Sequence, residues 1–302
     1  MFQEESYTKH SEWYDVIFPT EESKKAFFSQ HRDSNKDTIN DWLQNILFSP
    51  LTHLLNTPGL SWLTVGDAYG MDAHHLLSNG NAHTAHASDL NSNFLKIATE
   101  EGFIEDYSAE NAEKLSFENN KFDFVLCKEA YHHFPRPYMA VYEMLRVAKK
   151  GVVIIEPQDP ITKMPLLLFA ANMLSKFGDQ FVKSIWKNRI SYEPVGNFIY
   201  KVSEREVEKL AAGLNLPFVA FKRINPNFYN KNTATQKATS DNFNFTKIKL
   251  KKKMLDILVK LSICCSQVLG IVIYKEMPDA KKIKELENAG FYCVKIPANP
   301  YL

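Results

Sequence analysis

The stretch Leu63-Thr64-Val65-Gly66-Asp67-Ala68-Tyr69-Gly70 decides the fold, because it joins a short apolar run to the beginning of a helical pattern. Gly66 and Gly70 permit a tight turn and a close approach of the backbone to a ligand. The free N–H groups of a helix that begins at Asp72 face the same place. The stretch therefore predicts a strand, a nucleotide-binding turn and a helix, although a tight turn that binds nothing has the same pattern.

Apolar runs and helical patterns alternate along the chain outward from this turn. Strands are predicted at residues 62–65, 83–88, 122–127, 152–155, 218–224, 271–275 and 291–296. Helices are predicted at 72–79, 91–101, 137–147, 203–212, 247–267 and 280–289, with Asp72, Asn91 and Ser203 as N-caps and a capping box from Ser203 to Glu206. Strands that alternate with helices indicate an α/β protein with a doubly wound, largely parallel sheet.

We expect residues 1–302 to form one domain with four parts. These parts are a helical preface or lid at 1–57, a cofactor-binding core at 60–160, an inserted cap at 161–200, and C-terminal strands and helices at 203–302. Residues 225–245 are rich in Asn, Thr and Lys, which predicts a long loop or flap that is mobile at 227–244.

Composition limits the function classes. The chain has 302 residues, a formal charge of +1 and 45% hydrophobic residues, which is typical of a globular protein and excludes a strongly basic nucleic-acid-binding protein. The four cysteines form no CxxC pair, which favours a reducing compartment. The most apolar window, 257–274, is interrupted by polar residues. We therefore expect a cytoplasmic protein with no nucleic-acid partner and no membrane span, and the sequence leaves the oligomeric state open.

An acidic residue stands at the end of the second predicted strand. Asp89 follows Gly70 by nineteen residues, where a carboxylate can accept hydrogen bonds from both ribose hydroxyls of an adenosine-containing ligand. A surface residue or a helix cap would fit the same position. NAD enzymes share the glycine turn and the acid, so a third signal has to separate the two cofactors.

The third signal is Glu110-Asn111-Ala112-Glu113-Lys114-Leu115-Ser116-Phe117, followed by Phe122-Asp123-Phe124-Val125-Leu126-Cys127. Together with the glycine turn and Asp89, it resembles the class I S-adenosylmethionine-dependent methyltransferases over about residues 62–157. The resemblance implies a Rossmann-like sheet of seven strands, with the helical preface and the inserted cap added to it, and S-adenosylmethionine as cofactor.

The resemblance also implies roles for individual residues. Asp89 would hold the ribose, Asn111 and Ala112 the adenine edge, and Leu90 the adenine face. The remaining cofactor candidates, mostly around the methionine end, are Gly66, Asp67, Ala68, Gly70, Asp72 and Lys128. Asp72 is equally well explained as a helix cap. This chain departs from the family at Thr64, where an acid usually anchors the turn, and at Ala68, which replaces a glycine.

The reacting end is expected after the fourth and fifth strands, where such sheets bind ligands. Candidate bases are Glu129, His132 and His133, although paired histidines at this place in the family are often structural. Lys128 and Arg136 would hold a carboxylate or phosphate, or simply solvate the loop. Substrate candidates are Tyr131, Arg136, Tyr192, Glu193, Asn197 and Tyr200, and an ordinary cap with surface aromatics would explain the last four equally. No metal set is apparent.

We expect transfer of a methyl group to a hydroxyl of a sugar or nucleotide-linked sugar. Residues 62–76 and 128–137 resemble a subgroup from bacterial surface-polysaccharide clusters. The alternatives are a small-molecule N- or O-methyltransferase of another pathway, a non-catalytic binding partner, or a peripheral membrane protein that uses residues 246–263. The lysines in that segment gather at one end of it, which favours a solvated turn before a core helix over a membrane contact.

Overall fold

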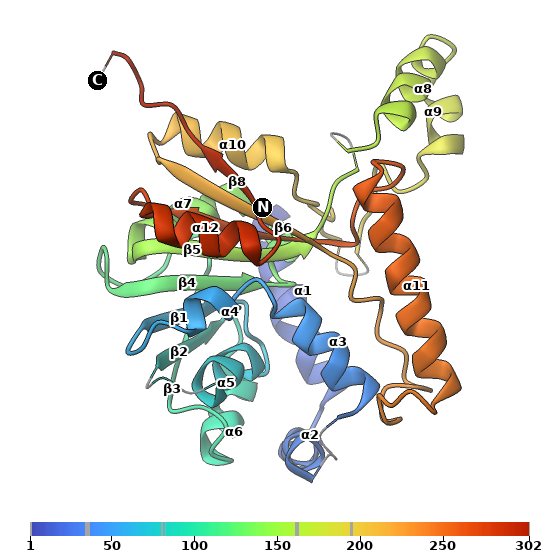
Figure 1. The fold of residues 1–302 in the computed structure, drawn as a ribbon. Coiled ribbons are helices and arrows are strands. Elements are labelled where there is room, and N and C mark those ends of the chain that lie inside the picture. Colours follow the sequence, from blue (N-terminus) through green and yellow to red (C-terminus); the bar gives the residue numbers. More distant parts are fainter. Residues whose placement is uncertain are drawn as a thin grey trace.

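An eight-stranded sheet forms the centre of the computed structural model, which describes residues 2–33, 37–79, 81, 83–160, 163–193 and 196–301 (Figure 1). The strands stand in the order β3-β2-β1-β4-β5-β7-β6-β8. Their bounds are β1 Ser61–Val65, β2 Thr84–Asp89, β3 Asp106–Ala109, β4 Phe122–Lys128, β5 Ala148–Pro157, β6 Phe218–Ile224, β7 Val268–Tyr274 and β8 Tyr292–Lys295.

The sheet is mixed. Strands β1 to β5 pair in parallel, β7 runs antiparallel to both β5 and β6, and β8 runs antiparallel to β6. The expected count of seven was one too few because Asp106–Ala109 was missed. This edge strand reads Asp-Tyr-Ser-Ala and buries none of its four side chains, so it has no apolar run to reveal it.

Both faces of the sheet are covered. Alternate residues of β1 enter different clusters: Trp62 packs with α5 (Met71–Ser78) and α6 (Asn93–Glu100), whereas Leu63 packs with α7 (Pro137–Val147) and α10 (Glu204–Gly213). Helices α4 (Thr52–Leu55) and α12 (Ala280–Asn288) add to the first cluster. Sheets of this kind bind ligands at the edge where the parallel strands end.

The chain begins with three helices, α1 (Phe2–Ile17), α2 (Glu21–Asp33) and α3 (Ile39–Leu47). Helix α1 contacts the loops that follow β2 and β3: the Asn91 side chain donates to the Ser11 carbonyl at 2.6 Å, and the Tyr7 hydroxyl donates to Glu113 at 2.7 Å. This preface therefore lies against the edge at which the parallel strands end.

Helix starts were predicted with mixed success. The capping box of α10 is present, since Ser203 Oγ accepts from Glu206 N and Glu206 accepts from Ser203 N. Asp72 and Asn91 are not N-caps. Gly70 caps α5 in a left-handed conformation, with φ +70°, and Ser92 caps α6 without a side-chain bond.

The predicted mobile flap is anchored. The amides of Ile39 and Asn40 donate to the carbonyls of Gln236 and Ala234 at 2.8 and 3.0 Å, and Ala234 is buried. The flap prediction rested on the low apolar content and on the many polar side chains of the segment, and it did not include these backbone bonds to the start of α3.

Three further helices stand on the right-hand side of Figure 1: α8 (Pro165–Ser175), α9 (Asp179–Ile185) and α11 (Phe243–Lys260). Helix α11 ends seven residues before the predicted limit of 267. A short 3-10 turn, η1 (Tyr131–His133), completes the helical segments of the described chain. Within the described ranges, no helix has both the length and the apolar character needed to cross a bilayer.

Candidate active site

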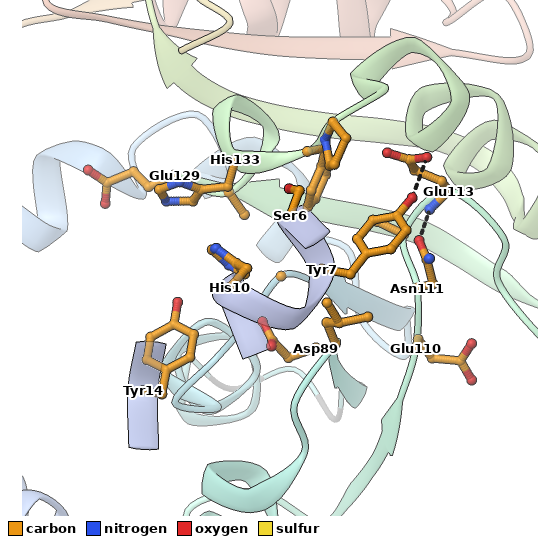
Figure 2. A pocket seen from close by; sticks show the side chains of 16 residues that line it. Ser6, Tyr7, His10, Tyr14, Asp89, Glu110, Asn111, Glu113, Glu129 and His133 are labelled. Carbon is orange, nitrogen blue, oxygen red and sulfur yellow. Dashed lines mark hydrogen bonds between the residues drawn. The ribbon is translucent and has the colours of Figure 1, made fainter. Parts of the chain in front are cut away.

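A pocket lies where β1, β2, β3 and β4 end, with α1 across it (Figure 2). Four of its residues, Ser6, Tyr7, His10 and Tyr14, come from α1, and the others come from the end of β2 and from the segments after the strands. Those others are Gly66, Asp89, Leu90, Glu110, Asn111, Ala112, Glu113, Glu129, Ala130, His133, Phe134 and Pro135.

The glycine turn is shaped by close contact. Gly66 has φ +75°, and a Cβ there would lie 2.4 Å from the Cβ of Ala130, so no larger residue fits. Ala68 is not among the described residues with positive φ, so an alanine is tolerated in place of the family's glycine.

Asp67 replaces the missing acidic anchor of the turn. Its carboxylate accepts from Thr64 Oγ1 at 2.9 Å and from the amides of Asp72 and Ala73 at 3.1 and 2.9 Å. Burial raises the pKa of Asp67, and these hydrogen bonds oppose the shift. The effect of burial is the larger one, so the pKa is raised overall. Thr64 and Asp67 together therefore fasten the turn to the first residues of α5.

Asp72 and Lys128 pair with each other beneath the turn. Lys128 Nζ lies 3.1 Å from Asp72 Oδ1 and 3.3 Å from Glu129 Oε2, and 5.0 Å from the ring centre of Phe48. Burial raises the pKa of Asp72 to about 7, although Lys128 opposes the shift. Of the cofactor candidates, only Gly66, Asp89, Leu90, Asn111 and Ala112 line the pocket.

Asp89 is a buried acid at the pocket wall. It accepts from the Asn91 amide at 3.0 Å. Burial raises its pKa to about 6 against the effect of backbone hydrogen bonds from Asn91 and Leu90. Asn111 accepts from the Glu113 amide at 2.9 Å, and Figure 2 shows this bond beside that of Tyr7 to Glu113.

His132 is held by a fully buried carboxylate. Glu156 accepts from the amides of Ala130 and Tyr131, each at 2.7 Å, and lies 2.6 Å from His132 Nδ1. Burial lowers the pKa of His132, but the charge and hydrogen bond of Glu156 and the charges of Glu193 and Glu129 together outweigh burial, so the pKa is raised overall. This histidine does not line the pocket, so its contacts are those of a structural residue.

His133 lines the pocket and pairs with the inserted segment. Its Nδ1 lies 2.5 Å from Glu193 Oε2, and its carbonyl accepts from Asn197 Nδ2 at 2.6 Å. Burial raises the pKa of Glu193, but the hydrogen bond from His133 and the charges of His133, His132 and His10 together outweigh burial, so the pKa is lowered overall. The ring of His10 lies 5.1 Å from that of His133, and burial lowers the pKa of His10 to about 4.

One candidate set of metal ligands exists within the described ranges. Ligand atoms of His132, His133 and Glu193 all lie within 4.8 Å of one another, which two histidines and a carboxylate need to hold a divalent ion. The sequence had shown no such set because Glu193 is sixty residues away from His133.

Several substrate candidates lie outside the pocket. Tyr131 is buried beside Val141 and Val202 and lines a different cavity, and Tyr192 is 67% exposed and packs on Phe198. Tyr200 packs edge-on against Phe198. We therefore no longer assign Tyr131, Tyr192 or Tyr200 to the substrate.

Arg136 and Asn197 hold the walls together. Arg136 Nε binds Glu113 at 2.5 Å, and the buried Asn197 accepts from Ser6 of α1. Glu129 has a left-handed backbone, with φ +52°, and is among the residues that line the pocket, while its carboxylate pairs with Lys128 at 3.3 Å.

The four pocket residues from α1 were not among the site residues predicted from the sequence. His10 and Tyr14 follow Ser6 at intervals of four, and Tyr7 stands three before His10. This spacing puts all four polar or aromatic side chains on one helix face. That pattern could have identified them from the sequence.

The sheet order, the glycine turn after β1 and the acid at the end of β2 define an α/β protein of the class that binds adenosine-containing cofactors. Residues 63–155 match the family model of the methyltransferase domain. The match supports a methyltransferase with S-adenosylmethionine as its cofactor.

Solved structures that resemble the chain are distant. The YcgJ protein of Bacillus subtilis is 16% identical, covers 76% of this chain and 99% of its own, and has a TM-score of 0.46. The 1,6-didemethyltoxoflavin-N1-methyltransferase of Burkholderia thailandensis, with bound S-adenosylhomocysteine, is 13% identical, covers 84% and 87%, and has a TM-score of 0.47. At these values neither structure bears on the substrate, and no curated protein matches the chain.

Proposed function

We propose that the protein transfers a methyl group from S-adenosylmethionine to a hydroxyl of a small polar acceptor. When bound, this cofactor supplies a methyl group already activated for displacement, so the protein has to align the acceptor, exclude water and accept a proton. The observation that carries the proposal is the 2.5 Å contact between His133 and Glu193 at the wall of a pocket that also contains Asp89 and Asn111.

The pocket residues fit the parts of the cofactor. Asp89, Leu90, Asn111 and Ala112 line the pocket. With the cofactor bound, the Asp89 carboxylate would accept from ribose hydroxyls, Asn111 and Ala112 would hold the adenine edge, and Leu90 would contact the adenine face. The Gly66 backbone is open to the methionine portion. In this arrangement Asp67, Ala68 and Gly70 shape the turn, and Asp72 and Lys128 support it from below.

His133 is the proposed general base. Glu193 occupies its Nδ1, which fixes the tautomer and leaves Nε2 to accept the proton of the acceptor hydroxyl. Glu193 acts as a positioning residue, because its carboxylate stabilises the imidazolium that forms. Glu129 also lines the pocket and is the remaining alternative base, whereas His132 is engaged by Glu156.

A sugar or nucleotide-linked sugar is the proposed acceptor, within surface-polysaccharide synthesis. Ser6, Tyr7, His10 and Tyr14 offer hydroxyl, imidazole and aromatic groups from one helix, a combination that suits a polar ring with several hydroxyls. The non-catalytic alternative is weaker than the sequence suggested, because Thr64 donates to Asp67 and the backbone of Ala68 is not left-handed.

The experiment is an acceptor screen followed by three variants. Purified protein is incubated with methyl-tritiated S-adenosylmethionine and a panel of monosaccharides and nucleotide-linked sugars. With an acceptor found, His133→Ala should lower kcat by roughly 10²–10⁴ and leave the Kd for S-adenosylhomocysteine unchanged. Glu193→Gln should lower kcat less, and Glu208→Gln on α10 is the matched control. Turnover within a few-fold of the parent for His133→Ala would exclude this base.

A further inference from the structure

Helix α11 exposes a row of large apolar side chains. Phe243, Leu250, Met254, Ile257 and Leu261 are between 51% and 70% exposed and follow one another at intervals of seven, four, three and four. This spacing places them in one stripe along the helix. The two buried residues of α11, Phe245 and Val259, lie on the opposite side, so the stripe points away from the protein.

Lysines border the stripe on both sides. Because each residue turns the helix by about 100°, Lys247 and Lys251 lie on one flank of the stripe, and Lys249, Lys253 and Lys260 lie on the other. The helix contains six lysines and a single acid, Asp256, which pairs with Lys252 at 2.7 Å. A protein with a formal charge of +1 thus concentrates positive charge on one exposed helix.

The pair α8 and α9 repeats the pattern on the same side of the molecule (Figure 1). Leu166, Phe169, Met173 and Phe177 are 45–81% exposed and are spaced by three, four and four residues. Helix α8 buries only Ala171 and α9 only Val182. Exposed lysines accompany this second apolar row at positions 176, 183 and 187.

We propose that α8, α9 and α11 form a docking surface for an anionic lipid bilayer. An exposed apolar stripe between flanking lysines is the pattern of a helix that lies in the membrane interface. A second copy of the chain fits less well, because a two-fold contact would set the same basic helix against itself. The sequence had favoured a core helix here, and this was wrong because α11 buries only two side chains.

Vesicle sedimentation of the full chain tests this proposal without reference to methyl transfer. We expect the protein to sediment with vesicles that contain phosphatidylglycerol, to bind pure phosphatidylcholine weakly, and to be released as salt increases. Leu250→Ser combined with Ile257→Ser should weaken binding by roughly ten-fold or more, since two apolar anchors are lost. Lys249→Glu combined with Lys253→Glu should weaken it by roughly five-fold or more per site and abolish the preference for anionic lipid.

Matched control variants are available outside this surface. Met277 is 48% exposed and Lys281 is exposed, so Met277→Ser and Lys281→Glu repeat the chemical changes elsewhere and should sediment like the parent. Circular dichroism and thermal midpoints verify that every variant is folded. Equal binding by parent and stripe variants, or no binding to either lipid, would overturn the proposal. So would a parent that forms dimers by light scattering and loses them in the stripe variants, since the stripe would then join two copies.

Discussion

Asp89 links cofactor binding to pH at the scale of a single residue. Burial raises its pKa to about 6, so its carboxyl becomes neutral as pH falls through that value. A neutral carboxyl accepts ribose hydroxyls poorly, so we expect the affinity for S-adenosylhomocysteine to rise as pH increases from 5 to about 7. Asp89→Ala should cost about 1.5–3 kcal/mol at pH 8 and flatten this profile. Calorimetry across the pH range measures both effects, with Glu105→Gln on the exposed surface as control.

We expect Glu156 to stabilise the folded protein as well as to position His132. It is fully buried and takes two amide donors and His132 Nδ1, so Glu156→Ala leaves three donors without their acceptor. Breaking such a buried ion pair costs about 3–5 kcal/mol of unfolding free energy. Urea denaturation measures this loss.

The pH dependence of that stability has a defined sign. Burial lowers the pKa of His132, but Glu156, with smaller effects from Glu193 and Glu129, outweighs burial and leaves the pKa raised in the folded state. Its contribution is therefore complete below the unfolded value near 6.5 and is lost as pH rises through the folded pKa. The difference between the parent and His132→Gln in urea should be larger at pH 6 than at pH 9. An equal difference at both values would contradict the charged pair.

Dialysis against a chelator tests whether His133 and Glu193 share a proton or bind a metal ion. The 2.5 Å contact with Glu193 is a hydrogen-bond distance, so we expect a shared proton between the two groups. Dialysis against EDTA should leave turnover unchanged, and added zinc should inhibit by taking His132, His133 and Glu193 as ligands. Loss of activity on dialysis that zinc or manganese restores would instead assign an ion to this set.

Residue positions could be predicted where a local sequence pattern marks them. Asp89 ends strand β2 and Asn111 belongs to the stretch 110–117, and both line the pocket, while their roles stay predictions. The partners of the histidines could not be predicted, because Glu156 and Glu193 approach them from segments 24 and 60 residues away. Such pairings depend on the tertiary fold, which brings distant segments together. The local spacing of residues in the sequence does not predict them.

At the scale of elements, we propose that α1 acts as a lid that moves when the cofactor enters and leaves. It covers the pocket and is held there by Tyr7 on Glu113 and by Ser6 on Asn197. We expect S-adenosylhomocysteine to slow hydrogen–deuterium exchange across α1, because ligand contacts favour the closed position. Tyr7→Phe removes one of these bonds and should speed exchange in the free protein. Unchanged exchange of α1 on ligand binding would show that it does not act as a lid.

Elements with a strong apolar period were predicted within a few residues. Helix α7 and strand β6 match the predicted 137–147 and 218–224. Helix α11 was placed but misread, since its apolar residues were assumed to face a core. The spacing of apolar residues shows that a helix has an apolar face, but it does not show whether that face packs on a core or is exposed.

At the scale of the whole molecule, the sheet order brings the ends of four strands, β1 to β4, to one pocket. The residues at this edge of the sheet distinguish between the two cofactors. A dinucleotide needs free amides at the first helix for its pyrophosphate. Here the amides of Asp72 and Ala73 are already bonded to the Asp67 carboxylate, at 3.1 and 2.9 Å. A pyrophosphate would meet a carboxylate in place of free donors, which disfavours NAD although Asp89 could hold its ribose.

Thermal unfolding tests this discrimination on the intact chain. A ligand at 100 times its Kd stabilises the folded state by about 2.7 kcal/mol, which raises the midpoint by several degrees. We expect S-adenosylmethionine and S-adenosylhomocysteine to produce this shift and NAD at the same concentration to produce none. Asp89→Ala should reduce the shift for both methionine-derived ligands without lowering the midpoint of the free protein to the same extent. A shift with NAD equal to that with S-adenosylhomocysteine would mean that the Asp67 carboxylate does not exclude a pyrophosphate and that the cofactor assignment has to be abandoned.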